Sequence, residues 1–436
     1  MKIIYLQEQI PERTRLQDDI EVLSQYIGDG EKVQHSVIRG KNKELCLRIE
    51  RQEDNIYANS SYFVGIDWIC ENNLAVYVRP KMNNNFEIDY VKMLNDALCQ
   101  SDNFEHLKDL VTIRFDKPSI YINQKYDILS IFLITEYINI LHKIVKKGLK
   151  KSFYIVRNNL SNKVKGRILI NRNIHLNLNK GNITNNYCQY QEYGINSIEN
   201  QILKKALFFC NKKLEIYKHS IDISHLKKKI SYINPYFETI SDNINTKEIK
   251  VYKANPIYKD YYQAIDLAQN ILKRYSYNIS SLGTNLIPTP PFWIDMSKLF
   301  ELYVYNLLKK VFTEKGEINY HTKAHYQELD YLLNPKEWGE PYIIDAKYKP
   351  RYKYLGGISI EDAREVSGYS RLSSIYKILG LDEVSATPIK CLIIYPDQDK
   401  KEEFEFNRFK EPTFDKVSGY VKLYKIGIKL PTIKKS

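Results

Sequence analysis

The sequence predicts a mixed α/β protein whose N-terminal part is rich in β-structure. Residues 62–69 and 74–80 are two apolar runs joined by an Asn-rich turn, which is the pattern of a β-hairpin. Near the C-terminus a helical pattern is followed by three short strand patterns, a second helix and a further strand. That order is typical of a mixed α/β layer arrangement. With 436 residues, of which 43% are hydrophobic, the chain is long enough for two or three domains.

The region between these two parts contains several helical patterns. Apolar periodicity predicts helices at about residues 88–100, 126–147, 197–217 and 259–275. The second of these helices is apolar enough to be buried, and short strands are expected among the later ones. Residues 280–284 and 288–291 are rich in Ser, Gly, Thr and Pro, and they predict a linker and a domain boundary.

The region after this boundary is predicted element by element. A helix at about 296–312 carries apolar residues at the spacing of a core-facing stripe, namely Phe300, Val304, Leu307, Leu308 and Val311. The following patterns predict strands near 317–322, 327–333 and 341–348, a helix at about 360–379 and a strand at 391–395. We therefore expect three domains: a β-rich one at residues 1–145, a mixed and basic one at 146–285, and an α/β core at 286–436.

The composition favours an intracellular protein with a polyanionic partner. The net charge is +13, although a sequence rich in Lys, Asn, Ile and Tyr also arises from AT-rich coding. The six cysteines form no Cys-x-x-Cys pair, which argues against a zinc ribbon and favours reduced thiols. The start of the chain turns polar too soon for a signal peptide, and the longest apolar segment, residues 128–141, contains Glu136 and is too short to span a bilayer. We expect a cytoplasmic protein without membrane contact.

The strongest chemical signal lies in two short stretches near the C-terminus. Asp330 falls in one predicted strand, and Asp345 and Lys347 fall in the next. Residues i and i+2 share one face of a strand, so Asp345 and Lys347 should point the same way. Two carboxylates at adjacent strand ends can hold a hard cation such as Mg²⁺, with the carbonyl of Ala346 as a third ligand. Lys347 would then orient a water molecule or stabilise phosphate charge, which predicts metal-dependent phosphodiester cleavage.

A simpler interpretation of these residues is that two strands end in solvated charges. However, Asp345 directly follows two isoleucines in a strand that reads as buried, where a charge is costly unless it is paired or metal-bound. Glu301, on the preceding helix, is an auxiliary candidate that could reach the cation. Glu328 shares the strand face of Asp330, and an exposed strand start explains it better.

Two further patterns bear on cofactors. His321 and His325 have a spacing that aligns two rings on a helix, but this segment reads as a strand and a turn, so we do not expect zinc. The sequence contains neither a Gly-x-x-x-x-Gly-Lys-[Ser/Thr] loop nor a Gly-x-Gly-x-x-Gly motif. If the system consumes a nucleotide, another subunit must bind it.

A long stretch of the middle region lacks acidic residues. From Tyr137 to Gln191 there is no Asp or Glu, while eleven residues are Lys or Arg. Such a stretch is suited to contacting DNA phosphates without regard to sequence, and the candidate contacts are Lys163, Lys165, Arg167 and Arg172. A solvated surface, or a docking site for an acidic protein, explains the same charges equally well.

The order of these motifs resembles McrC, the nuclease subunit of the McrBC modification-dependent restriction systems. Several segments carry the resemblance in sequence order: residues 64–66, 78–81, 147–154 and 165–168, and an Asn-x-x-Leu-Lys helix at 199–207. Residues 300–304, Asp330 and the Asp345-Ala346-Lys347 triplet are similar to the PD-(D/E)XK nuclease core of that family. The resemblance covers most of the chain.

The resemblance implies a role for each part. In McrC proteins the N-terminal region, here residues 1–145, engages a ring of McrB-like AAA+ GTPase subunits and stimulates their GTP hydrolysis. The partner binds GTP, recognises modified double-stranded DNA and moves it, while the McrC-like subunit cuts it with Mg²⁺. Glu365 departs from the family, because Gln is usual there and an ionised Glu cannot donate a hydrogen bond. Leu329 stands where the motif has Pro, which has no chemical role.

Two other functions are compatible with the same residues. The protein could be a non-catalytic adaptor that activates an AAA+ partner and binds DNA through the basic stretch. The intact set of Asp330, Asp345 and Lys347 argues against this, because an adaptor has no need of it. The protein could also be a stand-alone repair or recombination nuclease that needs no motor.

Overall fold

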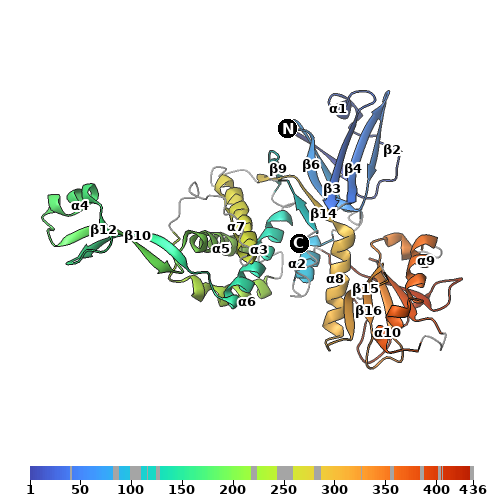
Figure 1. The fold of residues 1–436 in the computed structure, drawn as a ribbon. Helices are drawn as coiled ribbons and strands as arrows, with labels where there is room; N and C mark the ends of the chain where they lie inside the picture. The colour runs from blue at the N-terminus through green and yellow to red at the C-terminus, as the bar shows by residue number, and fades with distance from the viewer. Residues whose placement is uncertain are drawn as a thin grey trace. The chain divides into compact units, whose positions relative to one another are not determined.

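The computed structural model describes most of the chain: residues 1–39, 42–81, 88–98, 110–114, 116–123, 128–217, 223–242, 259–278, 286–325, 327–353, 358–382, 387–400, 404 and 406–432. The chain divides into two compact units. The first unit comprises Met1–Ile128 and Leu286–Ser436, and the second comprises Leu129–Asn285. The architecture is mixed α/β, as predicted (Figure 1). The division into three domains at residues 145 and 285 stays a prediction.

Two sheets form the N-terminal part of the first unit. One has the order β2-β5-β4-β3 and comprises Thr14–Arg15, Asn55–Ser60, Asn42–Gln52 and Lys32–Arg39. The other has the order β1-β7-β6-β14-β8 and comprises Lys2–Gln7, Leu74–Arg79, Phe63–Cys70, Phe292–Asp295 and Val111–Ile113. A short helix α1 (Ile20–Ser24) packs into the core that the two sheets share, where Leu23, Leu47 and Val76 are fully buried.

The predicted hairpin is confirmed as β6 and β7. These strands pair antiparallel, and the turn between them contains Asn72 with a φ of +64°, a conformation that Asn tolerates better than most residues. Gly65 on β6 is required by β14, the strand that pairs with β6 on the side away from β7. A Cβ atom there would lie 2.0 Å from the carbonyl oxygen of Phe292 on β14. Glycine therefore allows β14 to approach and pair with the hairpin.

The predicted linker is wrong for residues 288 and 289, which lie in a strand, whereas Pro290 and Pro291 connect two strands. Residues 280–284 lie outside the described part of the chain. β13 (Leu286–Thr289) pairs with β9 (Ile120–Asn123), and β14 begins at Phe292. Pro288 is tolerated because β13 belongs to a two-stranded sheet, in which each strand has a free edge. The side chains of β14 are all buried, so burial of Phe292 and Trp293 outweighs the local tendency to turn.

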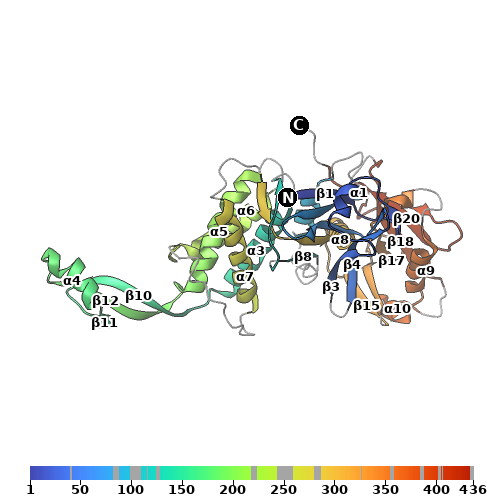
Figure 2. The same ribbon diagram turned by 90° about the horizontal axis from the view of Figure 1, so that it is seen from above.

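The second unit is built from helices and an arm of β-structure. The helices are α3 (Ile128–Lys147), α5 (Ile198–Tyr217), α6 (Ser224–Phe237) and α7 (Lys259–Asn278). The predictions for α3, α5 and α7 are confirmed, whereas α6 was missed because Pro235 interrupts its pattern. The arm consists of a long antiparallel pair with a short strand and helix at its end, namely β10 (Ser152–Ser161), β12 (Asn185–Gly194), β11 (Arg167–Ile168) and α4 (Ile170–Leu176). It projects away from the helices of the same unit (Figure 2).

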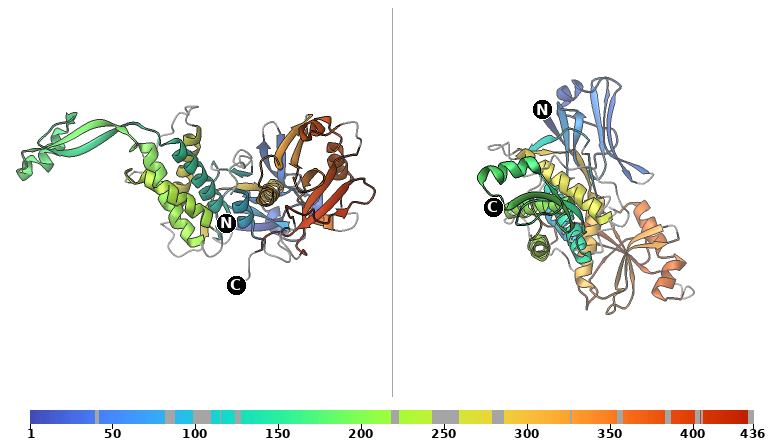
Figure 3. Two further views of the ribbon diagram at one scale, coloured as in Figure 1. Left: turned by 90° about the horizontal axis from the view of Figure 1, so that it is seen from below. Right: turned by 60° about the vertical axis from the view of Figure 1, so that its left-hand side comes forward.

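The C-terminal part of the first unit is a six-stranded sheet covered on both faces. The strand order is β15-β16-β17-β18-β20-β19, comprising Ile318–Ala324, Gln327–Leu333, Tyr342–Ala346, Lys390–Pro396, Leu423–Ile428 and Asp415–Lys416. The helix α8 (Met296–Val311), seen nearly end-on in Figure 3, packs against β15 and β17, and also against β6, β14 and α2 (Tyr90–Leu98) of the N-terminal part. The predicted helices and strands of this region are confirmed up to residue 346.

The predicted helix at 360–379 is wrong in its continuity. The structure has two helices, α9 (Ile360–Tyr369) and α10 (Ser373–Leu379), separated by a turn at Ser370. Leu372 at the start of α10 has extended backbone angles, and the preceding Gly368 and Ser370 are weak helix formers. The apolar residues of α9 nevertheless face the sheet, where Ala363 and Val366 join the same buried core as strands β16 to β18.

Candidate active site

The two predicted catalytic strands lie side by side in the sheet. β16 and β17 are antiparallel, with Tyr331 opposite Ile344, and the same register continued by one residue sets Asp330 opposite Asp345. The carboxylate of Asp330 accepts a hydrogen bond of 2.8 Å from the backbone N–H of Ala346. β17 is buried along its whole length because β16 and β18 pair with its two edges and α8 and α9 pack against it. The sheet therefore brings Asp330 to the motif that contains Asp345.

Asp345 and Lys347 face the same side of the sheet, as strand alternation predicts. The Lys347 Nζ atom lies 3.1 Å from Oδ2 of Asp345. This Oδ2 atom is buried and, within the described residues, accepts no well-aligned hydrogen bond. Burial raises the pKa of Asp345 to about 6, against the lowering effect of Lys347. Burial also tends to lower the pKa of Lys347, but the surrounding carboxylates outweigh it and the pKa is raised, so the ammonium stays charged.

The two aspartates place more negative charge in the site than one lysine can neutralise. Burial, Asp345 and Glu301 together raise the pKa of Asp330 well above its usual range. Two partly desolvated carboxylates that destabilise each other's charged forms are stabilised by a bound cation, and their oxygens are ligands that Mg²⁺ prefers. Across the described ranges no group of three or more His, Cys, Asp or Glu side chains is arranged to hold a metal. The two carboxylates fit Mg²⁺ only if the Ala346 carbonyl and water complete the shell.

Glu301 lies close to this site but is held by other residues. Its Oε1 atom lies 2.5 Å from Nε2 of His321 and accepts a 2.8 Å hydrogen bond from the Tyr320 hydroxyl. The second ring nitrogen of His321 lies 2.7 Å from Glu328. Burial lowers the pKa of His321, but the two carboxylates outweigh burial and raise it. His321 is therefore held between Glu301 and Glu328, and both carboxylates favour its protonated form.

Glu365 on α9 contacts Lys347 directly. Its Oε2 atom lies 3.1 Å from the Lys347 Nζ atom, and its Oε1 atom accepts a 2.9 Å hydrogen bond from Tyr369. Burial raises the pKa of Glu365, but Lys347 and Tyr369 outweigh it and the pKa is lowered. Lys347 is thus shared between Asp345 and Glu365. A Gln at this position could accept a hydrogen bond from Lys347 but could not form the ion pair.

Several residues that support the site were missed from the sequence. Asp362 on α9 is buried and accepts a 2.6 Å hydrogen bond from Lys349, two residues after Lys347. Tyr352 donates to the same carboxylate. At the other side, Glu8 and Gln9 contact Tyr348. None of these pairs has a local pattern, because each joins residues whose proximity depends on the tertiary fold.

The predicted DNA-contacting residues lie on the arm of the second unit. Lys163, Lys165, Arg167 and Arg172 are all exposed. Lys165 is paired with Glu192 at 3.0 Å, and Arg172 donates to the hydroxyl of Tyr187. At the other end of the acid-free stretch, Lys143 and Lys147 both pair with Asp260, so the fold supplies acidic partners that the local sequence lacks. The arm itself keeps an exposed cationic surface.

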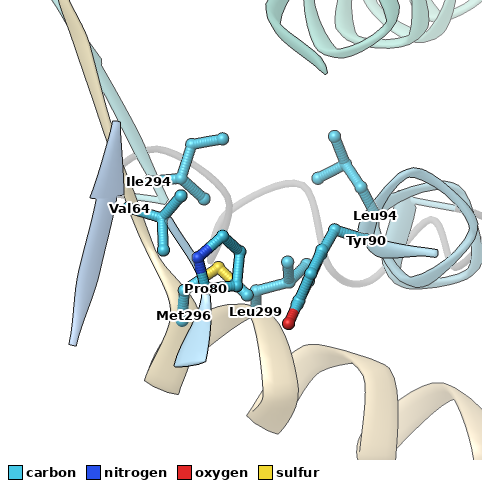
Figure 4. Close-up of a pocket in the computed structure, with 7 residues that line it drawn as sticks. All are labelled: Val64, Pro80, Tyr90, Leu94, Ile294, Met296 and Leu299. Atoms are coloured by element: carbon cyan, nitrogen blue, oxygen red, sulfur yellow. The ribbon is translucent and has the colours of Figure 1, made fainter. Parts of the chain in front are cut away.

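The apolar pocket in the first unit is not part of this site. It is lined by side chains such as Val64, Leu94 and Met296 from the N-terminal sheet, α2 and the start of α8 (Figure 4). Tyr90 supplies the one polar atom among the lining side chains, and none of them is charged.

In the helices that the structure describes, no segment is both long and apolar enough to cross a membrane.

Comparisons with known proteins agree with the motif order. A family model described as "McrBC 5-methylcytosine restriction system component" matches residues 61–396, more than half of the chain. No curated protein sequence matches. Among solved structures, a refined half-complex from a tetradecameric assembly of Thermococcus gammatolerans McrB AAA+ hexamers with bound McrC is 14% identical. The alignment covers 98% of this chain and 94% of that chain, with a TM-score of 0.38.

A second similar structure is the McrBC complex of the same organism. It is also 14% identical, the alignment covers 72% of this chain and 89% of that chain, and the TM-score is 0.28. Because these TM-scores are low, the family assignment rests on the family model, which spans β6, the arm and both catalytic strands. The chain therefore belongs to the family of McrBC 5-methylcytosine restriction system components, as its resemblance to McrC predicted.

Proposed function

We propose that this protein is the Mg²⁺-dependent DNA endonuclease subunit of a GTP-driven, McrBC-like restriction complex. It would cut modified foreign DNA and stimulate an McrB-like AAA+ GTPase. The observation that carries the proposal is the convergence of Asp330, Asp345 and Lys347 at the ends of two paired strands. An adaptor that only binds DNA would have no use for two buried carboxylates beside a charged lysine, because their desolvation costs free energy.

The residues of the site divide the chemistry among them. Asp330, Asp345 and the carbonyl of Ala346 would hold Mg²⁺, which supplies Lewis-acid stabilisation of phosphate charge. Lys347, which carries a proton throughout the physiological range, orients the attacking water or stabilises charge on the pentacovalent phosphate. Glu365 fixes the direction of the Lys347 ammonium from α9. Glu301, held by His321, adds negative charge beside Asp330. The product is hydrolysed DNA, with no covalent enzyme intermediate.

The partner and the DNA contacts belong to the same proposal. Solved assemblies that this chain resembles contain McrB AAA+ hexamers with bound McrC. We assign an equivalent GTPase ring to this chain, with GTP bound by the ring because the sequence lacks a phosphate-binding loop. Residues 1–145 would engage the ring, and the exposed cations of the arm would contact the double-stranded DNA. The complex would act in the cytoplasm.

The first test removes the catalytic groups one at a time. Asp345→Ala and Lys347→Ala should abolish cleavage while assembly with the GTPase, measured by co-purification, stays intact. Lys390→Ala is a matched control. Lys390 forms a half-buried ion pair with Glu411, and it lies beside Tyr342, at the end of β17 that is farther from Asp345. This control should cut DNA at close to the wild-type rate. Normal cleavage by either catalytic variant would refute the assigned site.

The second test separates the three candidate functions. Duplex DNA with and without 5-methylcytosine is incubated with the protein and Mg²⁺, with and without GTP and the co-purified GTPase. Cleavage that needs the modification, GTP and the partner supports the proposal. Cleavage by the protein and Mg²⁺ alone identifies a stand-alone nuclease. Stimulated GTP hydrolysis without any cleavage identifies an adaptor.

A further inference from the structure

A buried carboxylate from the N-terminus reaches the strand that carries the catalytic lysine. Glu8 follows directly after β1 and is almost fully buried. Its Oε1 atom accepts hydrogen bonds from the Tyr348 hydroxyl at 3.0 Å and from the backbone N–H of Lys81 at 2.9 Å. Its Oε2 atom has no hydrogen-bond partner within the described residues. A buried carboxyl that leaves one of its oxygens without a partner is costly, so its position beside this motif requires a reason.

Tyr348 connects this carboxyl to the site. Residues alternate across an extended chain, so Lys347 points toward α9 and Tyr348 points to the opposite side. There Tyr348 is almost fully buried, and its ring lies 5.8 Å from the ring of Phe300 on α8. The next residue after Glu8 holds the other end of Tyr348, because the Gln9 side chain donates to its carbonyl oxygen at 3.3 Å. Gln9 has a φ of +58°, an unfavourable conformation that the fold maintains.

The backbone that carries Lys347 continues beyond the end of its strand. The strand β17 ends at Ala346, where its pairing with β18 also ends. Beyond it, Lys347 donates to the carbonyl of Ile394 at 2.9 Å, and Lys349 donates back to Lys347 at 2.7 Å. Asp345 and Glu365 hold the ammonium end of Lys347. The course of the backbone that presents this side chain and the Ala346 carbonyl also depends on how residue 348 is held.

We propose that Glu8 is a positioning residue of the nuclease site, which fixes Tyr348 and through it the Ala346 carbonyl and Lys347. The N-terminal strand thereby completes a site whose Asp330, Asp345 and Lys347 all lie more than 320 residues later in the chain. This inference rests on the proposed nuclease function. It assigns to Glu8 and Gln9 a role in cleavage, beyond attaching the N-terminal sheet to the rest of the first unit.

The experiment compares variants of the full-length protein assembled with its GTPase. Cleavage of a linear duplex with 5-methylcytosine is measured with Mg²⁺ and GTP, together with thermal stability and GTPase stimulation. Glu8→Met removes both acceptor oxygens, and Tyr348→Phe removes only the donor hydroxyl. Each should lower kcat about 10- to 100-fold with KM for DNA nearly unchanged, as expected for a residue that orients catalytic groups. The double variant should be no worse than the more impaired single variant.

Two variants distinguish positioning from mere attachment. Glu8→Gln keeps an oxygen that can accept both hydrogen bonds. Its rate of cleavage should therefore stay within about three-fold of the wild-type rate, because the contacts to Tyr348 and Lys81 are kept. Ser60→Ala is the matched control. Ser60 is equally buried and holds the same segment through Gln7 and Ile10, yet it does not contact Tyr348. It should lose stability but not kcat.

The outcomes separate this inference from the nuclease assignment. If Glu8→Met and Tyr348→Phe lower kcat no more than Ser60→Ala does, the positioning role is wrong. If Glu8→Met does not fold, Tyr348→Phe and Glu8→Gln decide, since both preserve most of the packing. Asp345→Ala is included in every series. Normal cleavage by Asp345→Ala overturns the nuclease site itself, whatever the result for Glu8.

Discussion

At the scale of residues, two buried acids of the first unit show how partners set the charge state. Burial raises the pKa of Glu8 to about 8, because Lys81 and Tyr348 offset it only in part. Burial also tends to raise the pKa of Asp67, but His35 and Lys117 outweigh it and the pKa is lowered. Glu8 is therefore predominantly protonated at pH 7, whereas Asp67 is ionised. The difference follows from the cations that each carboxyl contacts.

The raised pKa of Glu8 predicts a pH-dependent stability. The unfolded pKa is about 4.5, so the folded state binds more protons than the unfolded state between about pH 4.5 and 8. The contribution of Glu8 is fully present below pH 4.5 and is lost as the pH rises toward 8, by up to roughly 1.4 kcal/mol per unit. Glu8→Gln should flatten this part of the curve in urea unfolding from pH 5 to 8. An unchanged slope would show that Glu8 is ionised when folded.

Alternation along a strand makes part of the site predictable from single residues. Asp345 and Lys347 share a face in any strand, and their 3.1 Å separation confirms that geometry. Asp330 could be placed in the neighbouring strand but not at a specific partner, because register depends on the turn between the strands. Glu8 and Asp362 could not be found, since each meets the site only after distant segments have packed.

At the scale of elements, strand β14 is held by burial of its own side chains and by a buried charge cluster formed by distant segments. The carboxylate of Asp67 on β6 accepts hydrogen bonds from Trp293 at 3.1 Å and Lys117 at 3.0 Å, and it lies 3.1 Å from the ring of His35. Four segments of the N-terminal part therefore converge on one side chain. The local composition around β14 contains mainly the signal of the prolines, and for this reason the sequence predicted a linker there.

This convergence predicts a large loss of stability when the charge is removed. Asp67→Asn leaves Lys117 and His35 beside a neutral amide, which should cost about 3–5 kcal/mol in the free energy of unfolding. The exposed pair of Lys2 and Asp19 is the control, and Lys2→Ala should change stability by less than about 1 kcal/mol. Urea unfolding of both variants measures the difference. Equal effects would mean that the Asp67 cluster contributes no more than a surface ion pair.

At the scale of the whole molecule, cutting and DNA contact are assigned to different units of one chain. The proposed catalytic residues belong to the first unit, and the exposed cations of the arm belong to the second. The net charge of +13 alone does not locate the DNA contacts, because many lysines are paired with carboxylates brought close by the fold. Cations without a carboxylate partner should contribute most to DNA affinity, because only these gain the full attraction of a nearby phosphate.

Two double variants test this assignment of the DNA contacts. Lys163→Ala with Arg167→Ala removes two exposed cations from the arm, and Lys143→Ala with Lys147→Ala removes two that already pair with Asp260. Both variants lose the same net charge from the same unit. The arm variant should bind duplex DNA more weakly, whatever the DNA sequence. The slope of log K, the binding constant, against log salt concentration should become less steep by roughly two, about 0.9 per lost phosphate contact.

The paired variant should change the slope much less, because its lysines stay near Asp260 in the wild-type protein and release few counterions on binding. Fluorescence anisotropy across a salt series measures both slopes with the same labelled duplex. Equal slopes for the two variants would show that the arm does not contact phosphate and that the affinity reflects net charge alone. In that case its exposed cations would be a solvated surface or a docking site for an acidic protein, the alternatives that the sequence leaves open.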